Sequence, residues 1–122
     1  MTVKECYEAM GGDYEGILSR MRKEERVIKF ALKFLADKSY EELCSSLADG
    51  DMDTAFRAAH TLKGVSQNLS FTRLFESSHR MAEALRPGAQ SGEDPAALLG
   101  EVTADYEVTA SAIRKLQESV GA

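Results

Sequence analysis

Apolar residues recur every three or four positions along most of the chain, which is the spacing that places them on one side of an α-helix. The repeats cover about 24–47, 52–69, 71–86 and 95–120. The periodicity is helical rather than alternating, so strands are not expected. We therefore predict four long helices, each with one apolar stripe.

Two short helices are predicted before the first long one. Thr2 with Glu5 has the spacing of a capping box and predicts a helix that stops at Gly11-Gly12. Asp13 can then cap a second helix.

The long helices carry end signals of their own. Ser39 with Glu42 repeats the capping-box spacing inside the first long segment and predicts a kink or brief break at Lys38-Ser39. The other signals are Asp51 or Asp53 as the cap of the helix near 52–69, Pro87-Gly88 after 71–86, and Asp94-Pro95 at the start of the last helix.

The composition bounds the fold. Nine Gly and two Pro among 122 residues leave little turn material. Amphipathic helices with mostly short connections bury their stripes best as an antiparallel up-down bundle. We predict an all-α four-helix bundle of this kind, with the short N-terminal helices packed as a lid at one end, and a single domain over residues 1–122.

The charge and the apolar runs exclude several classes of protein. The formal net charge is -5, and no basic run is longer than the interrupted RMRKEER, so nucleic acid is a poor candidate partner. The apolar runs fall far short of the roughly 18 residues that a membrane span needs, and the N-terminus does not resemble a signal peptide. We expect a cytoplasmic protein, and Met1 with the capped first helix favours a separate protein.

Cys6 and Cys44 form no C-x-x-C pair, so neither a zinc site nor a disulfide framework is indicated.

The segment 58–69, AAHTLKGVSQNL, carries a histidine on the polar side of its helix. At about 100° per residue, His60 lies about 150° from the centre of the apolar arc and should face solvent. Lys63, Gly64 and Gln67 follow at three, four and seven positions, so they stand on the same side. The four residues are predicted to form one exposed polar patch.

Gly64 is unexpected inside a helix because glycine costs about 1 kcal/mol relative to alanine there. One interpretation is that Gly64 ends the helix as a C′ residue, although the apolar period continues through Val65 and Leu69. The other is that the missing side chain lets another molecule approach the imidazole of His60. We favour the second.

An exposed histidine is ordinarily a plain surface residue, but the neighbours of His60 suggest a chemistry for it. A neutral imidazole nitrogen can act as a nucleophile toward phosphorus, and Lys63 supplies a positive charge where the transferred phosphoryl oxygens would sit. Gln67 could hydrogen-bond those oxygens or the ring.

The motif AAHTLKG, followed by NLSFTRL, resembles the signature of histidine-containing phosphotransfer domains of multistep phosphorelays. The resemblance implies a four-helix-bundle carrier in which His60 accepts a phosphoryl group from one receiver-domain aspartate and passes it to another. It also implies that Lys63 steadies the phosphohistidine and that Gly64 leaves room for the receiver to dock.

The same resemblance implies the partners and cofactors. The partners would be receiver domains of response regulators and a hybrid sensor histidine kinase, with no cofactor bound by this chain and Mg²⁺ on the receiver. No Gly-rich phosphate-binding motif is present in the sequence, so we expect a carrier rather than an enzyme. Nothing in the apolar stripes demands a dimer, and we expect a monomer.

Two positions depart from the family's pattern. Members often have glycine where this chain has Ser70, and many carry Gln or Glu near the histidine where this chain has Ala82. His79, on the flank of the helix 71–86, is interpreted as a structural or surface residue. A metal site from His60 and His79 lacks a recognisable third ligand.

Three further side chains are candidates for docking a partner: Arg57, one turn before His60, and Ile17 and Met21 of the expected lid. Two other functions stay open. The chain could be a helical adaptor that binds a receiver without carrying phosphate. It could also be the phosphoacceptor domain of a chemotaxis-type kinase, which receives phosphate from a catalytic domain.

Overall fold

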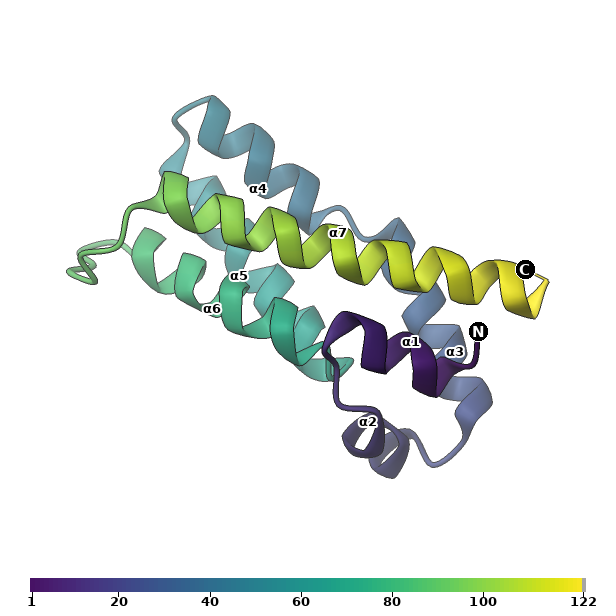
Figure 1. Cartoon of the computed structure of the whole chain (residues 1–122). Coiled ribbons are helices and arrows are strands. Elements are labelled where there is room, and N and C mark those ends of the chain that lie inside the picture. Colours follow the sequence, from purple (N-terminus) through teal and green to yellow (C-terminus); the bar gives the residue numbers. More distant parts are fainter. Residues whose placement is uncertain (122) are drawn as a thin grey trace.

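The computed structural model describes residues 1–121, which are helical and contain no strand (Figure 1). The all-α prediction is confirmed. The helices are α1 (Val3–Met10), α2 (Tyr14–Met21), α3 (Glu24–Lys33), the 3₁₀-helix η1 (Phe34–Ala36), α4 (Ser39–Ala48), α5 (Met52–Asn68), α6 (Thr72–Leu85) and α7 (Pro95–Val120).

Side-chain caps fix where several helices begin. Thr2 and Glu5 form the predicted capping box, in which the Glu5 N–H donates to Thr2 Oγ1 at 3.1 Å and the Thr2 N–H donates to Glu5 Oε1 at 2.8 Å. Asp13, Asp51 and Asp94 each accept a backbone N–H at the start of α2, α5 and α7. These predicted caps are confirmed.

The capping box predicted at Ser39 and Glu42 is wrong. Ser39 is the first residue of α4 rather than its cap, and no side chain caps α4 from the preceding Lys38. The carboxylate of Asp37 instead accepts the Ser39 N–H at 2.9 Å and the Ser39 hydroxyl. The predicted break before Ser39 is confirmed, but the backbone N–H of Ser39 is capped by the carboxylate of Asp37 rather than by that of Glu42.

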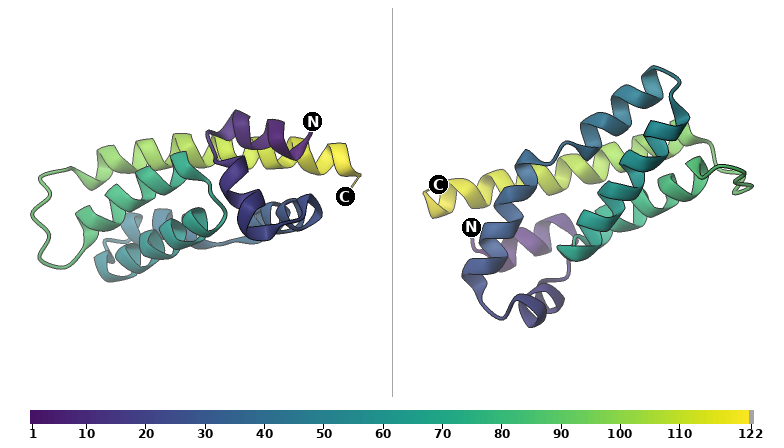
Figure 2. Two further views of the ribbon diagram at one scale, coloured as in Figure 1. Left: turned by 90° about the horizontal axis from the view of Figure 1, so that it is seen from below. Right: turned by 180° about the vertical axis from the view of Figure 1, so that it is seen from behind.

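The long helix α7 runs the length of the described molecule, and α1, α3, η1 and α6 pack against it (Figures 1 and 2). α6 packs against its N-terminal half, and α5 packs between α4 and α6. α1 and α3 lie beside the C-terminal half of α7, while α2 packs on α1 and α3. One side of α5 therefore remains open to solvent.

The predicted apolar stripes form most of the core. Leu43 of α4, Leu62 of α5, Leu74 of α6 and Ile113 of α7 are fully buried. Val120 was expected in the stripe of the last helix but is 43% exposed, because the last turn of α7 projects beyond α1 and α3 (Figure 1).

An aromatic cluster holds the turn that follows α5. The Phe71 ring lies 5.2 Å from Phe34 and 5.6 Å from Tyr7, measured between ring centroids. Phe34 lies 5.9 Å from Tyr106 of α7, and the Tyr7 hydroxyl donates to the Leu69 carbonyl at 2.8 Å. Side chains from α1, η1 and α7 thus fix the end of the helix that carries His60.

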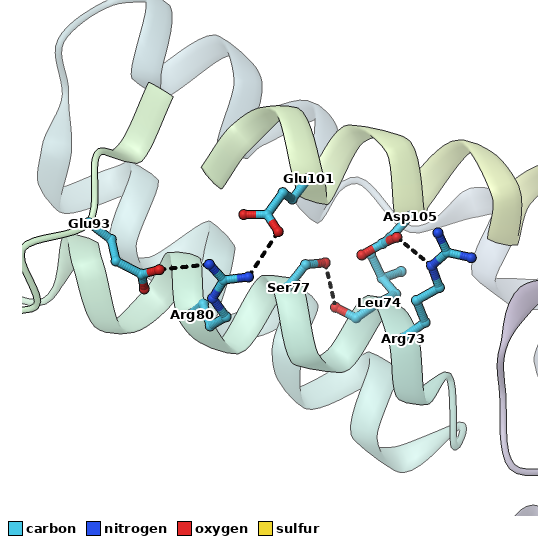
Figure 3. Close-up of polar contacts among 7 residues, drawn as sticks. All are labelled: Arg73, Leu74, Ser77, Arg80, Glu93, Glu101 and Asp105. Carbon is cyan, nitrogen blue, oxygen red and sulfur yellow. Dashed lines mark hydrogen bonds and ion pairs between the residues drawn. The ribbon is translucent and has the colours of Figure 1, made fainter. Parts of the chain in front are cut away.

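Ion pairs join α6 to α7 along the edge shown in Figure 3. Arg73 Nε lies 2.8 Å from Asp105 Oδ1. Arg80 bridges two elements, with Nη1 2.9 Å from Glu101 of α7 and Nη2 2.7 Å from Glu93 of the connecting loop. Exposed pairs of this kind contribute little stability each, but together they fix how α6 and the loop lie against α7.

Candidate functional site

His60 lies near the middle of α5, and its side chain is exposed, as the helical periodicity predicts. Ala59 and Leu62 on the opposite side are fully buried and anchor the helix in the core. At the start of α5, the carboxylate of Asp51 accepts the Thr54 hydroxyl at 2.6 Å and the Thr54 N–H at 3.1 Å. These hydrogen bonds hold the pKa of Asp51 below its ordinary value, so the cap is ionised at neutral pH.

The predicted partners of His60 follow it along α5. Lys63 and Gly64 are half-buried, and Gln67 is exposed. Because α5 continues to Asn68, Gly64 lies inside the helix, and the interpretation of it as a C′ residue is wrong. A Cβ built on Gly64 would meet no atom of a neighbouring element within 4 Å. The space next to the histidine is therefore open.

A surface pocket opens beside His60. Its lining residues are Phe56, Arg57, His60, Thr61 and Arg86. The Phe56 ring lies 6.1 Å from the imidazole of His60, measured between centroids, and the guanidinium carbon of Arg86 lies 5.3 Å from the Phe56 centroid. Arg86 is the C-cap residue of α6, so the end of the neighbouring helix brings a cation over the aromatic ring beside the histidine.

Glu83 lies on α6 one turn before Arg86 and pairs with it. Glu83 Oε1 accepts from Arg86 Nη2 at 2.9 Å, and Oε2 accepts from Nε at 3.3 Å. The hydrogen bonding to Arg86 lowers the pKa of Glu83, and the positive charge of Lys63 lowers it further. Because Lys63 belongs to α5, its charge reaches Glu83 from the other helix. The Glu83–Arg86 ion pair thus lies at the edge of the pocket that His60 lines.

The structure changes the set of predicted docking residues. Ile17 is fully buried, and the prediction that it contacts a partner is wrong, because α2 buries Ile17 as its single core residue. Met21 is half-buried and packs against the core. Arg57 is exposed, with Nη2 donating to Thr54 Oγ1 at 3.4 Å.

His79 is less accessible than His60. It is half-buried on α6, with its ring stacked on Phe75 at 5.8 Å between centroids and an interplanar angle of 15°. Its Nδ1 is buried and has no hydrogen-bond partner among residues 1–121. Ala82 of α6 is fully buried.

Four residues of the site are not predicted from the sequence: Phe56, Thr61, Glu83 and Arg86. Phe56 precedes His60 by four residues, so helical spacing alone could have placed the two side chains together. Glu83 and Arg86 come from the next helix, and no spacing within α5 indicates them.

The family model of the Hpt domain matches residues 35–116, which include His60 and every residue that lines the pocket beside it. The chain belongs to the Hpt domain family. The comparisons with curated proteins and with solved structures gave no match.

Hpt domains are phosphocarrier modules without catalytic machinery of their own. They act in histidine phosphotransfer within phosphorelays and two-component signalling, where they interact with receiver domains of response regulators. In the part of this Hpt domain that the structure describes, no helix has the length and apolar character needed to cross a membrane.

Proposed function

We propose that His60 is the phosphoacceptor of this Hpt domain, and that it takes a phosphoryl group from an aspartate of one receiver domain and passes it to another. The observation that carries this proposal is the placement of His60. Of the two histidines in the chain, it is the exposed one, and Gly64 leaves open space one turn away.

The transfer needs few groups from this chain. A neutral imidazole nitrogen of His60 attacks the phosphorus in line, and the N–P bond forms as the P–O bond to the aspartate breaks. The carboxylate leaves with the bonding electrons, and the proton on the other ring nitrogen goes to solvent. Lys63 balances the charge on the phosphoryl oxygens, and Gln67 supplies a hydrogen bond to them. Mg²⁺ belongs to the acidic pocket of the receiver.

The open side of α5 is the proposed docking surface. Gly64 gives the receiver clearance, and the exposed Arg57 offers it a cation. A small contact of this kind suits a carrier that must leave one partner for the next. We propose receiver domains and a hybrid sensor histidine kinase as partners of a monomer. The antiparallel up-down bundle, with the short N-terminal helices as its lid, stays a prediction.

The test is transfer from a receiver domain that carries a radioactive phosphoryl group. The unaltered chain and His79→Gln should both take up the label, whereas His60→Gln should take up none because its side chain has no nucleophilic nitrogen. The label should be acid-labile, as an N–P bond to imidazole is. Equal helical circular dichroism of the three proteins shows that the variants are folded.

Each other outcome contradicts the proposal in a distinct way. Label on His60→Gln means that another residue carries the phosphoryl group. Binding of the phosphorylated receiver without transfer to the unaltered chain favours the adaptor. Transfer only from a kinase catalytic domain favours the phosphoacceptor domain of a chemotaxis-type kinase.

A further inference from the structure

We infer that Arg86 is a second cation of the phosphoryl site, and that Glu83 is the anion that holds Arg86 until His60 is phosphorylated. The inference rests on the proposed role of His60. It adds two residues of α6 to a site that the sequence confines to α5.

The first step is the position of Arg86. It lines the same pocket as His60, and its guanidinium stacks over Phe56, whose ring in turn lies against the imidazole. A phosphoryl group on His60 would project into this pocket or along its rim. Arg86 comes from the C-terminal end of α6, so it approaches the pocket from the neighbouring helix.

The second step is the chemistry of the guanidinium. Arginine is charged at all relevant pH values, and its planar fork of N–H donors matches two oxygens of a phosphoryl group. Lys63, in contrast, offers a point charge on a flexible stem. The stacking on Phe56 limits where the Arg86 fork can lie, and so limits the entropy lost when it binds.

The third step is the role of Glu83. Both oxygens of its carboxylate now accept hydrogen bonds from Arg86, one from Nε and one from Nη2. The positive charge of Lys63 on α5 also lowers the pKa of this carboxylate. A phosphoryl group brings nearly two negative charges and three acceptor oxygens, and therefore competes for the same cations.

The exchange is possible because the resting pair is open to water. The side chains of Arg86 and Glu83 are 48% and 41% exposed, and ion pairs this accessible are weak. On phosphorylation, Arg86 would turn from the carboxylate to the phosphoryl oxygens without leaving the Phe56 ring. Glu83 thus lowers the affinity of the site for the phosphoryl group, whereas Arg86 raises it.

The inference predicts opposite effects for two neutral substitutions. Arg86→Gln removes the cation and should raise the pKa of the phosphoryl group, whereas Glu83→Gln frees Arg86 and should lower it. The probe is phosphoramidate, which labels the isolated chain without a receiver, and the readout is a ³¹P NMR titration. The ³¹P signal that is missing in His60→Gln is the one from phosphorylated His60. Arg86→Lys keeps a positive charge, so its phosphoryl pKa should lie between those of the unaltered chain and Arg86→Gln. Arg114→Gln, on the exposed side of α7, removes a positive charge elsewhere and is the matched control.

A second readout is the equilibrium of transfer with a receiver domain. Arg86→Gln should lower the share of label on His60 by about three- to tenfold, the size expected for one partly screened charge a few ångströms away. Glu83→Gln should raise that share. The equilibrium does not depend on how fast the partners dock, so a docking defect alone would leave it unchanged.

The results separate this inference from the proposed function. Loss of all labelling in the unaltered chain overturns the role of His60. Normal labelling, with Arg86→Gln and Glu83→Gln titrating like the unaltered chain, overturns the inference alone. Shifts of the same sign in both variants also overturn it, because they indicate that the pair only supports the end of α6.

Discussion

Ser70 is one of two residues other than glycine, with Arg22, that have a positive φ among residues 1–121. It adopts a left-handed conformation with a φ of 57°, where a side chain meets the following carbonyl and costs about 1 kcal/mol or more. The turn requires this conformation, because the Phe71 N–H donates to the Ser66 carbonyl at 2.8 Å and the Asp13 N–H donates to the Ser70 carbonyl at 2.8 Å.

We therefore expect Ser70→Gly to raise the free energy of unfolding by about 0.5 kcal/mol, measured by urea denaturation. The gain is smaller than the relieved strain, because glycine also adds freedom to the unfolded chain and the contact between Arg20 and the Ser70 hydroxyl is lost.

Ser45→Gly is the matched control for Ser70→Gly. Ser45 is exposed within α4, where glycine should lower the free energy of unfolding by about 0.5 kcal/mol. If both substitutions destabilise the chain, strain at Ser70 does not limit its stability.

In helix α5, Gly64 lowers helix stability and, under the proposed function, gives a receiver room to dock. A side chain there should stabilise the helix by up to about 1 kcal/mol, since it gains helix propensity and meets no neighbour. The same side chain would fill the space that a receiver needs. We expect Gly64→Gln to keep or raise the melting temperature and to slow transfer from a receiver.

Gly100 offers a control for both effects of Gly64→Gln. It lies in α7, away from His60, and a Cβ built on it also meets nothing within 4 Å. Gly100→Gln should raise stability by a similar amount and leave transfer unchanged. If Gly64→Gln transfers as fast as Gly100→Gln, clearance for the receiver is not the reason for this glycine.

Helix ends could be predicted from the sequence wherever the cap is local. Thr2 with Glu5, and Asp51 before α5, act within three or four residues, so spacing is sufficient to find them. Ser39 and Glu42 have the same spacing, but Asp37 reaches the Ser39 N–H first. The carboxylates of Asp37 and Glu42 compete for this N–H, and the path of the backbone decides which one reaches it. The 3₁₀-helix η1 bends the backbone before α4 begins, and spacing in the sequence does not show that bend.

The candidate site could be predicted only as far as it lies on one helix. His60, Lys63, Gly64 and Gln67 follow from the period of α5. Their cross-helix neighbours depend on how α5 and α6 pack, and no pattern in either helix fixes that register. Ile17 shows the same limit, because its burial depends on which neighbours cover α2.

The acid response of the whole molecule follows from its helix caps. Hydrogen bonds lower the pKa of Glu5 from its ordinary value of 4.5 and that of Asp51 from 3.8. The folded chain therefore binds fewer protons than the unfolded chain between the lowered and the ordinary values. Stability from these caps is complete above the ordinary values and is lost as pH falls through the lowered ones.

The last prediction removes this titration but keeps the hydrogen-bond acceptors. In the double variant Glu5→Gln with Asp51→Asn, amide oxygens can still cap α1 and α5, so the melting temperature should fall less steeply than in the unaltered chain between about pH 5 and pH 3. Glu8→Gln with Asp49→Asn changes the net charge equally at carboxylates that accept no hydrogen bond among residues 1–121, so its slope should match the unaltered chain. Equal slopes for both double variants would mean that general repulsion, rather than the caps, sets the acid stability.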